Sequence, residues 1–191
     1  MLEVCLPGGA RLIADLFFPG DLVRSAFIPP STEAALIAAN TGEIWRLRST
    51  ALDTLAAADP AVGRYVDGAL ARRIARQTIH AVTLGRFDSE QKVATLLLEL
   101  ALRLGQRNAT GAIAFEMPFD RKDIAFYLGL NPDTLSRIMS RFKTAGLIVQ
   151  PERSRAVVRD LSALAARSPA ARSLIETRGE RRQDAVLGTV L

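Results

Sequence analysis

The segment around residue 130 constrains the fold of this 191-residue chain most strongly, because local signals start and stop two short helices there. The first predicted helix covers residues 121–128 and ends at Gly129. Asn131 can cap a second helix, Pro132 suits its first position, and Gly146 ends it. Two short helices joined by a tight glycine-containing turn predict a helix-turn-helix.

The second helix separates apolar from polar side chains on opposite faces. At about 100° per residue, one narrow face gathers four apolar side chains: Leu135, Ile138, Met139 and Phe142. The opposite face carries polar and mostly short side chains: Asp133, Arg137, Ser140 and Thr144. This outward face lacks the glutamate and lysine that a generic solvated face normally carries. We therefore interpret it as a surface that enters a groove, in preference to a merely solvated face.

The outward face has the chemistry needed to read base edges in a DNA major groove. Arg137 can donate two hydrogen bonds to guanine, Asp133 can accept one from cytosine, and Ser136 or Ser140 can reach bases or phosphates. After Gly146, two short strands predict a hairpin wing. Basic side chains that flank the helices and lie in this hairpin are expected to contact phosphates: Arg121, Lys122, Arg141, Lys143, Arg153 and Arg155.

The rest of the chain predicts strands first and helices afterwards, an α+β arrangement. Strands are expected at 2–6, 11–18, 34–39 and 43–47. They are followed by a short helix capped by Ser49, a long helix over 60–84 and a helix from Ser89 to Gly105 that a capping box at 88–91 opens. A further strand is expected over 112–117. Phe17, Phe18 and Trp45 are expected to pack in the β-layer. Four strands are few for a closed two-sheet core, so this layer is expected to be a partial β-roll.

The long helix needs a partner for its apolar stripe, and a symmetric second copy is an economical one. Residues expected to make this dimerisation surface recur at helical spacings: Val62, Val66, Leu70, Ile74 and Ala81. Three arginines on the same helix, Arg72, Arg73 and Arg76, are interpreted as a solvated face.

Composition excludes several classes of function. One cysteine, Cys5, and one histidine, His80, cannot build a disulfide, a multi-thiolate zinc or iron–sulfur site, or a His–His metal pair within one chain. No nucleophile–base set or phosphate-binding loop can be assembled, so we do not expect an enzyme. The chain shows neither a secretion signal nor an apolar run of about 18 residues, which predicts a cytoplasmic protein that does not enter a membrane.

Charge is distributed unevenly along the chain. Residues 1–59 carry four arginines against seven acidic residues, whereas residues 60–191 carry 21 basic against 13 acidic residues. The basic C-terminal part predicts a module that binds a polyanion. The acidic N-terminal part is expected to have a different function.

The residues MPFDRKDIAFYLGLNPDTLSRIMSRFKTAGLI (117–148) resemble the DNA-binding segment of CRP/FNR-type transcription regulators, especially those of the FNR and FixK branch. FFPGDLV (17–23) is similar to the turn that precedes the effector pocket in that family. The resemblance extends to about residue 165 and implies a β-roll sensor domain, a long dimerisation helix and a winged helix-turn-helix. Asp133, Ser136 and Arg137 occupy the family's E-x-x-S-R base-reading positions, with Asp in place of the usual Glu.

The resemblance implies a homodimer that reads a palindromic operator with TTGA-like half-sites, and RNA polymerase as a further partner. We expect no cyclic nucleotide, because Glu33 lies near the position of the phosphate-binding arginine. The cysteine set that holds an iron–sulfur cluster is absent, and haem ligation by His80 is not expected.

The expected domains follow from these patterns: a truncated β-roll over 1–58, a dimerisation helix over 59–86, a winged helix-turn-helix over 87–165, and a C-terminal tail over 166–191 without an assigned function. The main hypothesis is a sequence-specific DNA-binding transcription regulator acting through the 132–145 helix. The alternative is a ligand-independent dimerisation or interaction protein with a degenerate sensor domain.

Overall fold

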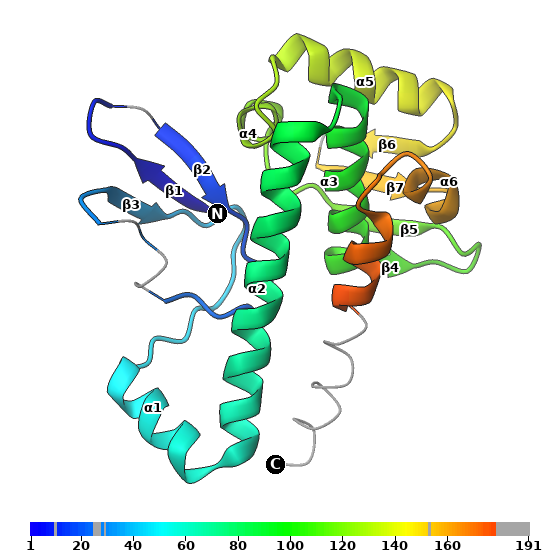
Figure 1. The fold of residues 1–191 in the computed structure, drawn as a ribbon. Helices are drawn as coiled ribbons and strands as arrows, with labels where there is room; N and C mark the ends of the chain where they lie inside the picture. The colour runs from blue at the N-terminus through cyan, green and yellow to red at the C-terminus, as the bar shows by residue number, and fades with distance from the viewer. Residues whose placement is uncertain (10, 25–27, 29, 153, 179–191) are drawn as a thin grey trace.

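The structure is a computed structural model that describes residues 1–178 except 10, 25–27, 29 and 153. The long helix α2 (Pro60–Arg86) runs through the middle of the molecule, with a small β-sheet on one side and the C-terminal half on the other (Figure 1). The mixed α and β composition, the long helix and the helix-turn-helix agree with the predicted fold class.

The N-terminal sheet contains three antiparallel strands in the order β2-β1-β3. Their bounds are Leu2–Cys5 for β1, Arg11–Asp15 for β2 and Glu33–Leu36 for β3. One face of β1 and β2 is buried, whereas every residue of β3 is exposed.

The predicted strand over 43–47 is wrong, because this segment has no strand structure. Trp45 is 86% exposed there and does not pack in the β-layer, while Phe18 is buried as predicted. The physical reason is that an isolated strand gains no ladder hydrogen bonds, and none of the described strands pairs with this segment.

The two helices that follow differ in how they begin. Helix α1 (Ser49–Ala58) has Arg48 at its N-cap position with no side-chain hydrogen bond, so the predicted cap at Ser49 is wrong. Helix α2 begins as predicted, with the Asp59 carboxylate accepting a hydrogen bond from the Ala61 amide at 2.8 Å and Pro60 in the first turn. The predicted long helix is thus confirmed, and it continues to Arg86.

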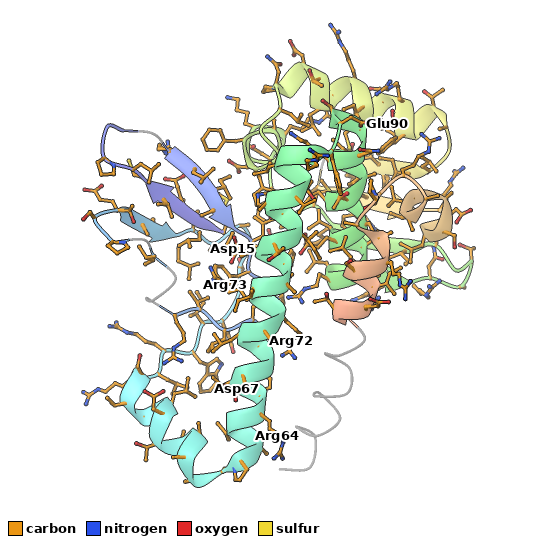
Figure 2. All side chains as sticks on the ribbon, in the orientation of Figure 1. Asp15, Arg64, Asp67, Arg72, Arg73 and Glu90 are labelled. Carbon is orange, nitrogen blue, oxygen red and sulfur yellow. The ribbon has the colours of Figure 1, made fainter. Side chains whose placement is uncertain are left out.

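Ion pairs attach α2 to the N-terminal segment. The Arg73 guanidinium lies 2.8 Å from the Asp15 carboxylate at the end of β2, and the two side chains converge in Figure 2. The Asp21 carboxylate forms an ion pair with the Arg76 guanidinium at 2.9 Å and a second one with the Arg103 guanidinium. Arg76 is therefore a buried and Arg73 a half-buried ion-pair partner, and the prediction that they form a solvated face is wrong.

The C-terminal half contains a second sheet with the strand order β4-β5-β7-β6 and several helices around it. The bounds of its elements are α3 Ser89–Leu104, β4 Gln106–Arg107, β5 Ile113–Glu116, α4 Arg121–Tyr127, α5 Pro132–Thr144, β6 Ile148–Glu152, β7 Arg155–Val158 and α6 Leu161–Ala165. Helix α3 opens with the predicted capping box, in which Asp88 and Gln91 each bond the other's backbone amide.

The core is built around α3, whose residues from Val93 to Leu102 are buried except at Glu99. The same apolar cluster includes Ile13, Leu16 and Phe18 from the N-terminal segment. The two halves of the chain therefore share one core, and β2 packs directly against α4.

The beginning of the predicted C-terminal tail also packs on this core. Residues 171–178 are helical, and Leu174 is buried in the apolar cluster. The Thr95 and Ser168 hydroxyls share a buried hydrogen bond of 2.8 Å. Within the part of the chain that the structure describes, no helix is both long and apolar enough to cross a membrane.

Candidate nucleic-acid interface

Helix α5 is positioned by local signals at both of its ends. The Asn131 side-chain oxygen accepts a hydrogen bond from the Asp133 amide at 2.8 Å, and Pro132 occupies the first turn. Past the other end, Gly146 has a φ of 72°, a left-handed conformation that suits glycine. The helix therefore begins and ends where the sequence predicts.

The inner face of α5 anchors the helix to the domain. The four predicted apolar residues are each at most 4% exposed: Leu135, Ile138, Met139 and Phe142. This face packs against α3 and α4. Burial of four large apolar side chains fixes the rotation of α5 about its own axis, so the opposite face is held toward solvent.

The outer face of α5 carries the predicted base-reading residues. Asp133, Arg137 and Ser140 are exposed, and Ser136 is half-buried. The Ser136 hydroxyl oxygen lies 3.4 Å from a guanidinium nitrogen of Arg121, which therefore donates to it from the first turn of α4. The structure thus brings one predicted phosphate contact next to one predicted base-reading residue.

The remaining predicted phosphate contacts surround this face. Lys122 is exposed on α4, Lys143 is exposed in the last turn of α5, and Arg155 is exposed at the start of β7. Arg153 lies outside the described residues. The wing itself is confirmed as the β6–β7 hairpin, which joins the domain's sheet through β5.

Arg141 has an intramolecular partner that the sequence did not reveal. Its guanidinium lies 3.0 Å from the Glu90 carboxylate, whose other oxygen is 2.5 Å from Arg167. Glu90 is labelled at the start of α3 in Figure 2. The three residues are distant in sequence, so no local pattern predicts the cluster. Arg141 is 63% exposed, which leaves part of its guanidinium open to solvent.

His80 connects α2 to the helix-turn-helix. Its ring stacks on Tyr127 of α4, with centroids 4.0 Å apart and an interplanar angle of 9°. Burial lowers the pKa of His80 to about 4 and raises the pKa of Tyr127 well above its ordinary value. The imidazole is therefore neutral near neutral pH. Among the residues that the structure describes, no group of three or more His, Cys, Asp or Glu side chains could hold a metal ion.

The five predicted dimerisation residues of α2 lie on different faces. Val66 is buried within its own chain, Val62 and Leu70 are half-buried, and Ile74 and Ala81 are exposed. Sequence reasoning missed the other residues of the exposed stripe. It consists of small or apolar side chains at alternating spacings of three and four, the spacing of a coiled-coil seam: Ala71, Ile74, Thr78, Ala81 and Gly85.

The prediction that no cyclic nucleotide binds concerns the N-terminal stretch 23–36. Glu33 is exposed on β3, and Arg24 pairs with Asp53 of α1 at 3.4 Å. Parts of the stretch between them, 25–27 and 29, lie outside the described residues. The absence of cyclic-nucleotide binding therefore stays a prediction.

The anchored helix, the exposed polar face and the hairpin define a winged helix-turn-helix domain preceded by a long helix and a β-sheet. The family model of the Crp-like helix-turn-helix domain matches residues 91–167. In this domain the chain is therefore similar to CRP/FNR-type regulators, as the sequence resemblance implied.

Proteins of known description are similar to a longer part of the chain. A probable transcriptional activator of Rhizobium leguminosarum bv. viciae is 33% identical over 150 residues, which make up 78% of this chain and 62% of that protein. The nitrogen fixation regulation protein FixK of Azorhizobium caulinodans is 32% identical over 119 residues, 62% of this chain and 48% of FixK. The chain thus spans about half to three fifths of the length of these curated relatives.

Solved structures share the fold. FixK2 from Bradyrhizobium japonicum matches with a TM-score of 0.63 at 24% identity, over 88% of this chain and 83% of FixK2. A CRP-family transcriptional regulator from Thermus thermophilus matches with a TM-score of 0.62 at 23% identity, over 87% of this chain and 83% of the regulator.

Proposed function

We propose that this chain is a sequence-specific DNA-binding transcription regulator that acts in the cytoplasm as a homodimer on a palindromic operator. The observation that carries the proposal is the orientation of α5, whose apolar side is buried while Asp133, Arg137 and Ser140 face outward. Catalysis has no part in this role. RNA polymerase is the further partner expected of such a regulator.

Arg137 is the main base-reading residue in this proposal. Its exposed guanidinium can donate two hydrogen bonds to O6 and N7 of guanine, a contact that contributes about 1–3 kcal/mol of discrimination. Asp133 and Ser140 extend the reading surface to neighbouring base pairs. The Ser136 hydroxyl accepts a hydrogen bond from Arg121 at 3.4 Å. We therefore assign this pair to the edge of the base-reading face, where it can contact either a base or a phosphate.

Phosphate contacts come from the exposed cations around α5. Lys122 and Lys143 lie at the two ends of the helix-turn-helix, and Arg155 lies on the wing. Such contacts fix the register of the helix on DNA and make binding depend on salt. Arg141 can add a phosphate contact through the part of its guanidinium that Glu90 leaves open.

The exposed stripe of α2 is the proposed dimer seam. A two-fold dimer must place its two α5 helices about 34 Å apart so that they enter successive major grooves. Helix α2 is 27 residues long, which corresponds to about 40 Å. Ile74 is 67% exposed within this stripe, so it is the apolar side chain that would bury most surface against a second copy.

The central experiment is the selection of bound sequences from random duplex DNA by the full chain. We expect an inverted repeat whose half-site spacing reports the dimer. The variant Arg137→Ala should then relax the preference at one base pair, whereas Lys143→Ala should weaken all duplexes alike and flatten the salt dependence. Selection of no consensus at all, with a folded protein, would refute the proposal.

The dimer is tested separately by sedimentation. Ile74→Glu should shift the chain from dimer to monomer without unfolding it, because the side chain is exposed within one chain. Leu55→Glu on α1 is the matched control, since Leu55 is also exposed at 51% but lies away from the stripe. Equal association of both variants and the wild type would contradict the proposed seam.

The alternative is an interaction protein that docks through its N-terminal part. The observation in its favour is the exposed apolar segment before α1, where Ile44, Trp45 and Leu47 are 74%, 86% and 61% exposed. Dimerisation without binding to any selected duplex would favour this role.

A further inference from the structure

A cavity lies beneath helix α5, on the side of this helix opposite to its proposed base-reading face. Its volume is about 420 Å³, and its walls come from α3, the segment before α4, α4, α5 and β6. Small-molecule sites in proteins usually enclose about 300–1,000 Å³. The cavity is therefore large enough for a small organic ligand.

The floor of the cavity is apolar. Its most buried side chains come from three helices and are each at most 5% exposed: Val93, Leu96, Leu97, Ile124, Leu135 and Met139. These side chains have no polar atom with which to bind a ligand head group. The floor consequently suits an alkyl or aryl body.

The rim of the cavity is polar and mainly cationic. Arg121, Lys122 and Asp120 are exposed there, and Gln150 is half-buried. The Asp120 carboxylate already accepts a hydrogen bond from the Asp123 amide at 2.8 Å, as the cap of α4. Two cations against one engaged carboxylate favour a ligand that carries a negative charge at its outer end.

We propose that this cavity binds a small amphipathic carboxylate, with its apolar body on the floor and its carboxylate between Arg121 and Lys122. The same two residues are proposed phosphate contacts, and Arg121 also donates to Ser136 at 3.4 Å. A bound carboxylate competes for these cations and so lowers the affinity for DNA. This second effect rests on the proposed function, whereas the binding itself does not.

The first test measures binding without DNA. Isothermal titration of the full chain uses octanoate as the probe and 1-octanol as its uncharged match. We expect saturable one-to-one binding of octanoate, at least tenfold tighter than that of 1-octanol. Lys122→Gln should reduce this preference severalfold. Equal affinity for the two probes would overturn the role of the rim, and no saturable binding of either would overturn the site.

A cavity-filling variant locates the site. Val93→Phe places a larger side chain in the floor and should weaken octanoate binding at least tenfold, while circular dichroism and DNA affinity without octanoate stay unchanged. If this variant does not fold, Val93→Leu fills less volume and should still weaken binding measurably. Unchanged octanoate affinity in a folded Val93 variant would overturn the assignment to this cavity.

The second test measures the effect on DNA. Fluorescence anisotropy with a selected duplex should show at least fivefold weaker binding in saturating octanoate than in acetate at the same concentration, and Val93→Phe should abolish this difference. If octanoate binds in calorimetry but leaves the DNA affinity unchanged, the proposed competition with DNA is wrong, whereas the proposed binding site is still supported. If no duplex binds at all, the proposed function fails, and calorimetry still decides whether the cavity is a binding site.

Discussion

Replacing Asp21 by Asn tests how the N-terminal segment is held to the two long helices. The Asp21 carboxylate contacts both Arg76 of α2 and Arg103 of α3, and all three side chains are at most 13% exposed. The substitution keeps the shape of the side chain, including an oxygen that can accept from the Phe18 amide. It removes the negative charge and leaves two buried guanidinium groups without their shared carboxylate.

The magnitude follows from the burial of these charges. Breaking a buried ion pair by removing one partner costs about 3–5 kcal/mol. Two features reduce the loss here: the Phe18 ring lies under both guanidinium groups, with its centroid 6.0 and 4.9 Å away, and Glu99 is near. Burial raises the pKa of Glu99, and Arg76 and Arg103 only partly offset that rise. We therefore expect Asp21→Asn to lower the free energy of unfolding by about 3 kcal/mol.

Urea denaturation followed by circular dichroism at neutral pH measures this loss. The matched control is Asp53→Asn, because Asp53 also pairs with an arginine, Arg24, but is 64% exposed and 3.4 Å away. An exposed pair contributes less than about 1 kcal/mol, so the control should stay near the wild type. The reasoning is refuted if Asp21→Asn and Asp53→Asn lose the same small amount.

Three further substitutions probe the helix-turn-helix and its contact with α2. Burial holds the pKa of His80 near 4, below its ordinary 6.5, so the unfolded chain binds an additional proton between these pH values and stability falls as the pH drops. From pH 7 to pH 5 the wild type should lose about 2 kcal/mol more than His80→Phe in urea denaturation, and equal losses would contradict the burial of a neutral imidazole. Phe142→Ala should cost about 3–5 kcal/mol, whereas the half-exposed Phe126→Ala should cost less than about 1 kcal/mol; similar values would mean that α5 is not anchored as described. Asn131→Ala removes the cap of α5 and should lower the free energy of unfolding by about 1 kcal/mol, while Asn131→Asp, which keeps an acceptor, should stay near the wild type.

Helix α5 could be predicted from the sequence because its determinants are local. Asn131, Pro132 and Gly146 fix its ends, and the period of its apolar residues fixes which side is buried. The same holds for the capping box of α3 and the first residues of α2. Strong local signals and tertiary packing agree at these places.

Other parts of the molecule depend on contacts between residues far apart in sequence. The partners of Arg76 and Arg141 are 55 and 51 residues away, so neither pair leaves a pattern along the chain. The buried side of α2 is chosen by which segments pack on it, and this is why Val66 faces inward while Ile74 faces out. The segment 43–47 has the composition of a strand but lacks a described neighbour to pair with.

The insertion of Ile13, Leu16 and Phe18 into the apolar cluster around α3 has a consequence for how the protein unfolds. The C-terminal half cannot separate from the first strands without exposing Leu96, Ile124 and Tyr127, which line the contact between them. Heat or denaturant should therefore melt the sheet and the helix-turn-helix in a single cooperative step. A fragment that begins at α3 would be less stable than the same residues within the whole chain.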